Sequence, residues 1–181
     1  ADIVDELDKL LWCDFLILQF PLWWYSVPAI MKGWIDRVFV HTVAYGKGMR
    51  LDQGGLRGRK AMLVTTTGCF EQMLQPDGLV GDPGVILYHL HAGAPAYSGF
   101  TVLPPFSACA IHYCDDDRRR QYLDDYALRL RTLDTVTPLA FQALADFGPD
   151  GRLLTEAQAV DCGHWRPASV PEPTFQSDAG R

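Results

Sequence analysis

A short apolar segment that leads into a proline- and aromatic-rich loop constrains the fold of this chain more than any other feature. The segment covers residues 15–18, FLIL, and has the character of a buried parallel strand. Residues 19–39, QFPLWWYSVPAIMKGWIDRVF, follow directly, and a helix pattern opens near Pro28, where a proline suits the first helical turn. A strand, a loop and a helix in this order predict a parallel α/β sheet with a ligand-binding loop at the carboxyl end of the strand.

Strand and helix patterns continue to alternate along the chain. Residues 60–67, KAMLVTTT, predict a second buried strand, and residues 85–92 predict a short helix that crosses back. Residues 101–111, TVLPPFSACAI, begin another strand, which we expect two prolines to interrupt. Residues 115–133 predict a helix, because aspartates open it and arginines follow, as the helix dipole favours.

The secondary-structure pattern weakens toward the end of the chain. Prolines and glycines become frequent from residue 147 onward. A length of 181 residues makes one domain the default. We therefore expect an α/β domain over residues 1–145 and a loosely ordered tail over residues 146–181.

The overall charge and the cysteine content exclude several classes of function. A net charge of −6 argues against nucleic acid as a partner, because phosphate binding needs an excess of lysine and arginine. No apolar run reaches the roughly 20 residues that a membrane-spanning helix needs. The five cysteines have no framework spacing, which predicts reduced thiols in a soluble, cytoplasmic protein. Cys162 and His164 match no standard zinc pattern, so we expect no metal site.

The beginning of the chain is unusual for a doubly wound fold. Such folds open with a strand, a small-residue phosphate loop and a helix, whereas the first segment of this chain, ADIVDELDKLL, has the pattern of an amphipathic helix. Its apolar face would hold Ile3, Leu7, Leu10 and Leu11. Either the fold differs or the chain lacks its first strand–helix–strand unit, and we expect the second. Such a chain would fold poorly.

Three segments near the predicted strands carry groups that suit a flat ligand. The turn TTTG, which ends at Gly68, offers hydroxyl and N–H groups for the polar edge of a planar ring. Trp24 and Tyr25 could pack along that ring, and Tyr45 could form a wall over its face. This combination favours a flavin. The alternative is that the tryptophans of residues 19–39 are ordinary core or dimer-interface aromatics.

A long pattern links these segments to a known family. Residues 21–39 read PxxWxxxPAxxKGWxxRVF, and VAYGKGM and the turn TTTG follow. In this pattern, which continues to about residue 140, the chain resembles the NAD(P)H:quinone oxidoreductases, the flavodoxin-like two-electron quinone reductases. A match of this length is far more specific than a lone glycine motif.

The resemblance implies a flavodoxin-like doubly wound parallel sheet and a homodimer whose active site lies between the two subunits. It implies FAD as the cofactor, with FMN as the alternative, and NAD(P)H as the co-substrate. The implied reaction is a ping-pong hydride transfer through flavin N5 to a quinone or a similar flat acceptor. The chain would then be an oxidoreductase, an NAD(P)H dehydrogenase (quinone).

The resemblance also implies roles for individual positions. The residues that lie along the isoalloxazine ring are Pro21, Leu22, Trp23, Trp24 and Tyr25. Those that bind the pyrimidine side of the ring are Thr66, Thr67, Gly68 and Cys69. The cofactor-binding arginine is Arg119, which Arg118 and Arg120 flank. The substrate wall consists of Ala44, Tyr45 and Gly46, and the catalytic positions are Tyr45 and Trp24.

The chain departs from the family pattern at several positions. Cys69 replaces the last glycine of the turn, a small change if the φ angle there is negative. Leu74 and Val80 stand where mammalian members carry a tyrosine and a histidine proposed to stabilise charge on the reduced flavin. The segment that binds the phosphate and adenosine half of the flavin has no counterpart, so we expect weak cofactor binding.

Two other functions stay open. One is a regulatory flavoprotein subunit of a potassium efflux system, a role that relatives of the family have, with only incidental enzyme activity. The other is an inactive fragment of a quinone reductase. A flavin-loaded dimer fits the first, whereas an insoluble and colourless protein fits the second.

Overall fold

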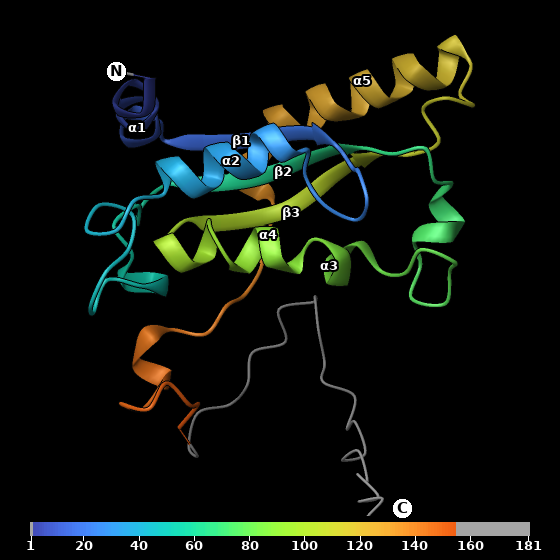
Figure 1. Ribbon diagram of the computed structural model, residues 1–181. Coiled ribbons are helices and arrows are strands. Elements are labelled where there is room, and N and C mark those ends of the chain that lie inside the picture. The colour runs from blue at the N-terminus through green and yellow to red at the C-terminus, as the bar shows by residue number, and fades with distance from the viewer. Residues whose placement is uncertain (1, 155–181) are drawn as a thin grey trace, which may run out of the picture.

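The computed structural model describes residues 2–154, and its centre is a three-stranded parallel sheet. The strands are β1 (Phe15–Pro21), β2 (Lys60–Thr66) and β3 (Thr101–Ala108), in the spatial order β1-β2-β3 (Figure 1). Both neighbouring pairs are parallel. The predicted parallel α/β architecture is therefore confirmed.

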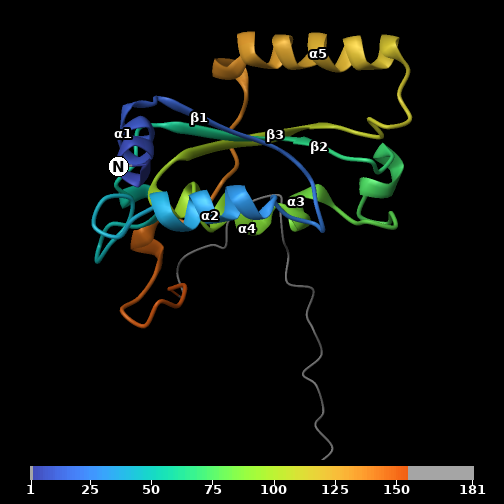
Figure 2. The same ribbon diagram turned by 45° about the horizontal axis from the view of Figure 1, so that its top comes forward.

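Helices cover both faces of this sheet. They are α1 (Asp2–Trp12), α2 (Ala29–Val38), α3 (Pro83–Ile86), α4 (Tyr88–Ala92) and α5 (Asp116–Arg131). Figure 2 shows α5 above the sheet and α2, α3 and α4 below it. Short 3-10 helices lie at Leu51–Gln53, Glu71–Leu74, Ala96–Ser98, Leu133–Thr135 and Leu144–Asp146. The layers are thus helix, sheet and helix, as a doubly wound fold requires.

The main core lies between the sheet and the α2–α4 layer. Leu18, Phe20 and Leu63 of the strands cluster there with Val38 of α2 and Leu90 of α4, and all of them are buried. Burying each such side chain contributes about 1.5–3 kcal/mol. β2 is buried along nearly its whole length, as the central strand of a sheet covered on both faces should be.

A second, smaller core lies under α5. Met62, Val64 and Leu103 form its buried part. Phe106 of β3 packs against Tyr126 of α5 with ring centroids 5.2 Å apart. The β1 side chains on this face are only partly buried, so α5 covers β2 and β3 better than it covers β1.

β3 continues through Pro104 and Pro105 rather than stopping there. Its pairing with β2 shifts register between Met62 and Val64, opposite the prolines. A proline has no N–H to donate to the neighbouring strand, and a local irregularity removes the need for that bond. The predicted interruption is therefore a bulge within one strand.

The helix predicted over residues 85–92 is wrong in its bounds, because two short helices occupy residues 83–92. The carboxylate of Asp82 caps α3 by accepting a hydrogen bond of 2.7 Å from the N–H of Gly84. Leu87 separates α3 from α4 with φ −92° and ψ 0°, and its side chain is buried. The apolar spacing continues across this break, so the pattern alone does not reveal it.

The helix predicted at the beginning of the chain is confirmed as α1. Leu10 is its buried residue, whereas Leu11 is 38% exposed, so the apolar face is narrower than predicted. The indole of Trp34 in α2 donates to Glu6 at 2.8 Å, and Arg59 donates to the carbonyl of Leu11 at 2.7 Å. The first bond holds α1 against α2, and the second satisfies a carbonyl acceptor at the carboxyl end of α1.

The predicted boundary between domain and tail falls in the 3-10 helix Leu144–Asp146. Beyond it, Phe147 and Leu153 pair in an antiparallel bridge. The rest of the predicted tail lies outside the described residues, so the boundary stays a prediction. Within residues 2–154, no helix combines the length and the apolar character needed to cross a membrane.

Asp52 joins the segment near residue 144 to the loop before β2. Its carboxylate accepts a hydrogen bond from the N–H of Leu144 at 2.6 Å and another from the side chain of Gln53. The Leu144 N–H, followed by Gln53, lowers the pKa of Asp52 below its ordinary value. A lowered carboxyl pKa stabilises the folded state above the unfolded pKa of about 3.9, and this contribution is lost as the pH falls through the folded value.

We therefore expect Asp52→Ala to loosen this attachment at neutral pH. Hydrogen exchange at the Leu144 amide should become about two- to fivefold faster, the range for one exposed charged interaction. In the unchanged protein the same amide should be released only below about pH 4. Asp124→Ala in α5 is the matched control. Equal acceleration in the control, or none in Asp52→Ala, would contradict this role of Asp52.

Candidate functional site

The carboxyl ends of the strands meet at one edge of the sheet. Pro21 stands opposite Thr66, and Thr66 opposite Ala108. Backbone bonds extend this pairing, since Leu22 donates to Thr66 at 2.8 Å and Thr67 donates to Ala108 at 3.0 Å. The loops that follow β1, β2 and β3 therefore lie side by side, at the edge where parallel sheets bind ligands.

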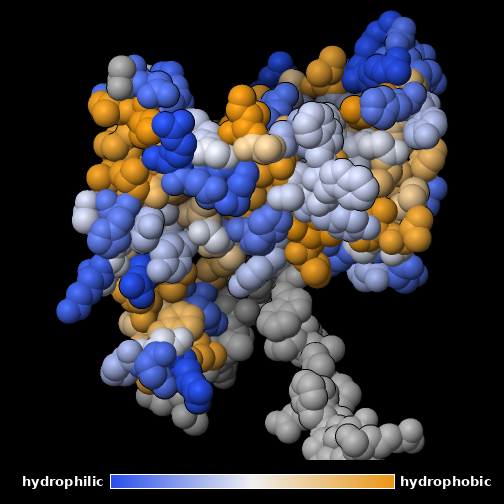
Figure 3. Space-filling view, in the orientation of Figure 1, coloured by the Kyte–Doolittle hydropathy of each residue, from blue (hydrophilic) through white to orange (hydrophobic). Residues whose placement is uncertain are grey.

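The loop after β1 is a tight turn that holds aromatic rings in solvent. Trp23 and Ser26 exchange backbone hydrogen bonds of 3.0 and 2.9 Å, so Trp24 and Tyr25 form the two-residue tip, which we call the aromatic turn. Both tip residues have positive φ, 49° and 64°, which bulky side chains rarely adopt. Trp24 is 96% exposed and Tyr25 52%. Figure 3 shows ring side chains of intermediate hydropathy gathered over this loop.

Backbone strain occurs in both halves of the predicted site. Within residues 2–154, positive φ angles at residues other than glycine occur at Trp24, Tyr25, Thr42, Leu51 and Ala110. The aromatic turn and Ala110 follow β1 and β3 at the carboxyl edge, whereas Thr42 and Leu51 flank the loop of Tyr45. Each such backbone conformation lowers the stability of the folded state by about 1–3 kcal/mol, and such conformations are most frequent at functional sites.

The alternative that the tryptophans are core residues fits only Trp34. Its indole is half-buried, packs edge-on against Phe39 with centroids 5.9 Å apart, and donates to Glu6. Trp23, in contrast, is 59% exposed beside the still more exposed Trp24. A core role is therefore wrong for the two tryptophans at the aromatic turn.

The turn after β2 places hydroxyl and N–H groups at the same edge. The Thr67 hydroxyl accepts a hydrogen bond from the N–H of Cys69 at 3.1 Å, and the hydroxyls of Thr65 and Ser107 pair at 2.8 Å. Cys69 is not among the residues with positive φ, so it replaces a glycine there without backbone strain. The turn is thus ordered by its own hydroxyl groups.

Several backbone donors at this edge are available to a ligand. Within residues 2–154, the N–H groups of Trp24, Tyr25 and Gly68 donate to no protein acceptor. A planar ligand with acceptors on its edge would find a stacking surface and hydrogen-bond donors together here. The isoalloxazine ring of a flavin has this character, so the residues present fit it.

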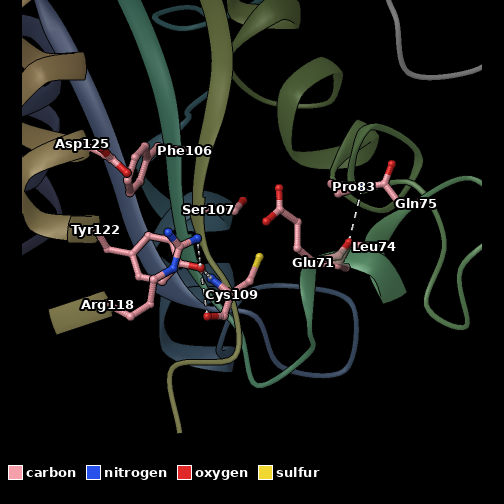
Figure 4. A pocket seen from close by; sticks show the side chains of 10 residues that line it. All are labelled: Glu71, Leu74, Gln75, Pro83, Phe106, Ser107, Cys109, Arg118, Tyr122 and Asp125. Atoms are coloured by element: carbon pink, nitrogen blue, oxygen red, sulfur yellow. Dashed lines mark hydrogen bonds between the residues drawn. The ribbon is translucent and has the colours of Figure 1, made fainter. Parts of the chain in front are cut away.

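A pocket of about 340 Å³ opens beneath α5, next to the end of β3 (Figure 4). The Arg118 guanidinium lies 4.3 Å from the ring centre of Tyr122 and donates to its hydroxyl at 3.2 Å. That hydroxyl donates in turn to the carbonyl of Cys109 at 3.1 Å. The Tyr122 hydroxyl is the largest cause that raises the pKa of Arg118, so this group stays cationic.

Carboxylates complete the lining of this pocket. Glu71 and Asp125 line it together with Arg118 (Figure 4). The pocket therefore offers a cation for a phosphate and acceptors for hydroxyl or amino groups. A nucleotide presents both kinds of group.

The arginine in this pocket is not the one that the resemblance implies. Arg119 pairs with Asp116 at 2.8 Å, and Arg120 is likewise paired within α5. One residue of helix, about 100° of rotation, separates Arg118 from Arg119. The spacing of Arg118 and Tyr122, four residues apart on one helix face, is the pattern that could have found it.

The buried thiol at this edge belongs to Cys109. Burial, followed by the nearby carboxylate of Glu71, raises the pKa of the Cys109 thiol above its ordinary value, and such a thiol stays protonated at neutral pH. Within residues 2–154, no group of three or more metal-ligating side chains gathers. Cys162 and His164 lie outside the described residues.

Tyr45 lies at the opposite edge of the sheet from the aromatic turn. α2 carries the chain back along the sheet, so the loop of residues 39–59 lies at the amino ends of the strands (Figures 1 and 2). β1 has seven residues, and a strand of this length spans roughly 23 Å. The structure therefore does not bring Tyr45 to Trp24 or to the Thr66–Cys69 turn within one chain.

The loop that carries Tyr45 is held tightly. The N–H of Gly55 donates to the carbonyl of Ala44 at 2.9 Å. A Cβ at Gly55 would lie 1.8 Å from the carbonyl oxygen of Val43, so only glycine lets the chain pass there. Ala44 and Gly46 are buried, which leaves the half-buried ring of Tyr45 as the group that this loop presents.

Comparison with known proteins agrees with this architecture. The family model described as "Flavodoxin-like fold" matches residues 1–132. NAD(P)H dehydrogenase (quinone) 1 of Rattus norvegicus is 40% identical over 140 residues, which cover 77% of this chain and 51% of that protein. Ribosyldihydronicotinamide dehydrogenase (quinone) of Homo sapiens is 36% identical over 148 residues, which cover 82% and 64%. The chain spans about half the length of the curated relatives it matches.

Solved structures show the same relationship. A Klebsiella pneumoniae protein assigned to the quinone reductases matches with a TM-score of 0.79 and 36% identity, over 92% of this chain and 70% of that one. General stress protein 14 of Treponema denticola, solved in complex with FMN, matches with a TM-score of 0.61 and 26% identity, over 75% and 73%. The chain therefore belongs to the flavodoxin-like family of quinone oxidoreductases.

Proposed function

We propose that this protein is a flavin-dependent oxidoreductase that uses NAD(P)H to reduce quinones, or similar flat acceptors, by two electrons. The observation that carries the proposal is the aromatic turn, whose strained backbone holds flat rings in solvent. Relatives named as quinone dehydrogenases support it. When bound, the flavin would supply the redox chemistry, a ping-pong hydride transfer at N5.

The residues that would hold the flavin follow from the carboxyl edge of the sheet. Along the ring we place Pro21, Leu22, Trp23, Trp24 and Tyr25. At its pyrimidine side we place Thr66, Thr67, Gly68 and Cys69. We favour FAD over FMN, because the pocket beneath α5 offers partners for a second ribose and phosphate. In that pocket we assign the phosphate contact to Arg118 in place of Arg119.

The proposed site needs a second copy of the chain. Tyr45 lies at the far edge of its own sheet, a strand length of roughly 23 Å from the aromatic turn. A two-fold homodimer can bring the Tyr45 loop of one copy over the aromatic turn of the other, and its symmetry then forms two equal sites. The substrate wall of each site would come from the second copy.

The chain itself would contribute position, exclusion of water and backbone hydrogen bonds. Leu74 and Val80 are aliphatic, and Leu74 is also buried, so neither side chain can exchange a proton with a bound reactant. The free N–H of Gly68, which no acceptor within residues 2–154 occupies, is placed to hold negative charge instead. We therefore infer that backbone donors and water replace the family's tyrosine and histidine.

An absorbance scan of the purified protein, followed by an NADPH oxidation assay with menadione, tests the proposal. We expect a yellow protein whose flavin turns over with the quinone. A folded but colourless protein would overturn the proposal. Bound flavin without turnover would favour the regulatory role instead, and an insoluble, colourless product would favour the inactive fragment.

Arg118→Leu should weaken FAD binding without changing the fold. Loss of one charge-assisted hydrogen bond costs about 1.5–3 kcal/mol, so the dissociation constant should rise roughly ten- to hundredfold. Fluorescence titration with FAD measures the change. Arg120→Leu is the matched control, because Arg120 pairs with Asp117 on the same helix and does not line the pocket. Equal losses in both variants would refute the assignment.

A further inference from the structure

A cavity of about 460 Å³ lies beside the Tyr45 loop, away from the proposed flavin contacts. Arg50, Tyr97 and Phe147 are among its lining residues. Its volume falls in the range of about 300–1,000 Å³ that small-molecule sites occupy. The Tyr97 ring, which lines the cavity, lies 5.8 Å from the ring of Tyr45, the group proposed as the substrate wall.

One cation, Arg50, lines this cavity, and it forms no ion pair with a carboxylate of residues 2–154. The guanidinium of Arg50 lies 6.0 Å from the ring centre of Tyr97, and Lys47 precedes it by three residues. Within residues 2–154, neither Arg50 nor Lys47 forms an ion pair, although the whole chain carries a net charge of −6. Residues 41–50 contain no Asp or Glu. An arginine without a carboxylate partner on the wall of a cavity favours an anionic group of a ligand.

The carboxylates close to the cavity already have other partners. Asp52 accepts from the N–H of Leu144, and Asp146 accepts from the N–H of Ala143. Asp150 accepts from the N–H of Arg152 at 3.1 Å. These acids keep their negative charge, but their hydrogen bonds are made to donors other than Arg50.

Backbone hydrogen bonds order the segment that carries Lys47 and Arg50. Gly46 and Met49 exchange backbone hydrogen bonds of 2.9 and 3.1 Å, so Lys47 stands at the tip of a tight turn. Gly48 completes this turn with φ 71°, a value that glycine adopts without strain. Arg50 follows in an extended conformation and borders the cavity. The two positive charges therefore flank one short, ordered segment.

We propose that this cavity binds an acidic substituent, a carboxylate or a sulfonate, of the electron acceptor while the acceptor's flat ring lies against Tyr45. This specificity rests on the proposed quinone reductase function. Arg50 binds the acid directly, and Lys47 strengthens the local field. A dinucleotide fits less well, because it would bring at least two phosphates to a cavity lined by a single guanidinium.

Paired kinetics with a neutral and an anionic acceptor test this proposal. The unchanged protein, Arg50→Gln and Lys47→Gln are assayed with NADPH and either menadione or a naphthoquinone sulfonate. For the sulfonate, KM should rise about two- to fivefold in each variant, the range for one exposed charge pair, with kcat unchanged. For menadione, KM should stay constant. Arg131→Gln in α5 is the matched control for loss of one positive charge.

Salt and direct binding give independent readouts. Added sodium chloride should raise the KM of the unchanged protein for the sulfonate and not for menadione, because salt screens exposed charges. Quenching of tryptophan fluorescence by the sulfonate, without NADPH, should weaken in Arg50→Gln by a similar factor.

Three outcomes distinguish a failure of the acidic-acceptor proposal from a failure of the proposed reductase function. Equal effects of Arg50→Gln on both acceptors, or no effect on either, would overturn the acidic-acceptor proposal while leaving the reductase function standing. A raised KM for NADPH alone would overturn it in favour of the dinucleotide. Failure of the unchanged protein to reduce either acceptor would instead reject the proposed function, and the quenching titration would still report whether Arg50 binds the sulfonate.

Discussion

Replacing Trp24 and Tyr25 by asparagine and glycine is expected to stabilise the protein and to abolish flavin binding. Both positions have positive φ, which asparagine and glycine adopt with little strain, so the free energy of unfolding should increase by about 2 kcal/mol. The exposed rings contribute little packing, since Trp24 is 96% exposed. Removing them should eliminate the stacking surface for the flavin. Urea unfolding and flavin titration measure the two effects.

A second exposed tryptophan provides the control for this double variant. Trp12 at the end of α1 is 85% exposed and has no positive φ, so Trp12→Asn should neither stabilise the protein nor change flavin affinity. If the double variant keeps its flavin, the aromatic turn is not a wall of the site. If it is less stable than the unchanged protein, the turn is not strained. Residues that are retained for binding characteristically give variants with a higher free energy of unfolding and a lower ligand affinity.

Tyr45→Ala should lower the rate of quinone reduction while leaving flavin affinity unchanged. Tyr45 sits at the amino ends of the strands, so the length of a strand, roughly 23 Å for seven residues, separates it from the carboxyl ends, where the aromatic turn lies. As a substrate wall supplied by a second copy, its ring would orient the acceptor. Loss of such positioning typically costs about a hundredfold in kcat/KM. The flavin spectrum and steady-state kinetics separate the two effects.

Tyr45→Phe is the matched control, because it keeps the ring and removes only the hydroxyl. This variant should retain most of the activity, since the proposed role belongs to the ring. A large loss in Tyr45→Phe would assign the role to the hydroxyl instead. Parallel loss of flavin and activity in Tyr45→Ala would show that Tyr45 supports the fold, through its contact with Tyr97, rather than the substrate.

The sheet and the aromatic turn could be predicted because local residues determine them. The strands β1 and β2 follow from continuous apolar runs, and the turn follows from aromatic residues between a strand end and Pro28. The path of β3 through Pro104 and Pro105 could not be predicted, because it depends on the register of the neighbouring strand. The break at Leu87 depends on the cap at Asp82 and on tertiary burial.

The sequence suggested candidate residues for the site but not how they are arranged in space. Arg118 and Arg119 differ by one step of helix phase, and only the packing of α5 decides which of them lines the pocket. The position of Tyr45 could have been predicted from the topology. A helix that follows a strand in a parallel sheet returns the chain to the end of the sheet where the strands begin. That rule separates Tyr45 from Trp24 within one chain and makes a second copy necessary for the proposed site.

Subunit mixing tests most directly the claim that each site is built from two copies of the chain. The Trp24→Asn/Tyr25→Gly variant lacks the flavin wall, and the Tyr45→Ala variant lacks the substrate wall, so each alone should be nearly inactive. Refolded together in equal amounts, random pairing forms half mixed dimers, each with one intact site, and about a quarter of full activity should return. Activity no higher than the mean of the two separate variants would contradict a shared site.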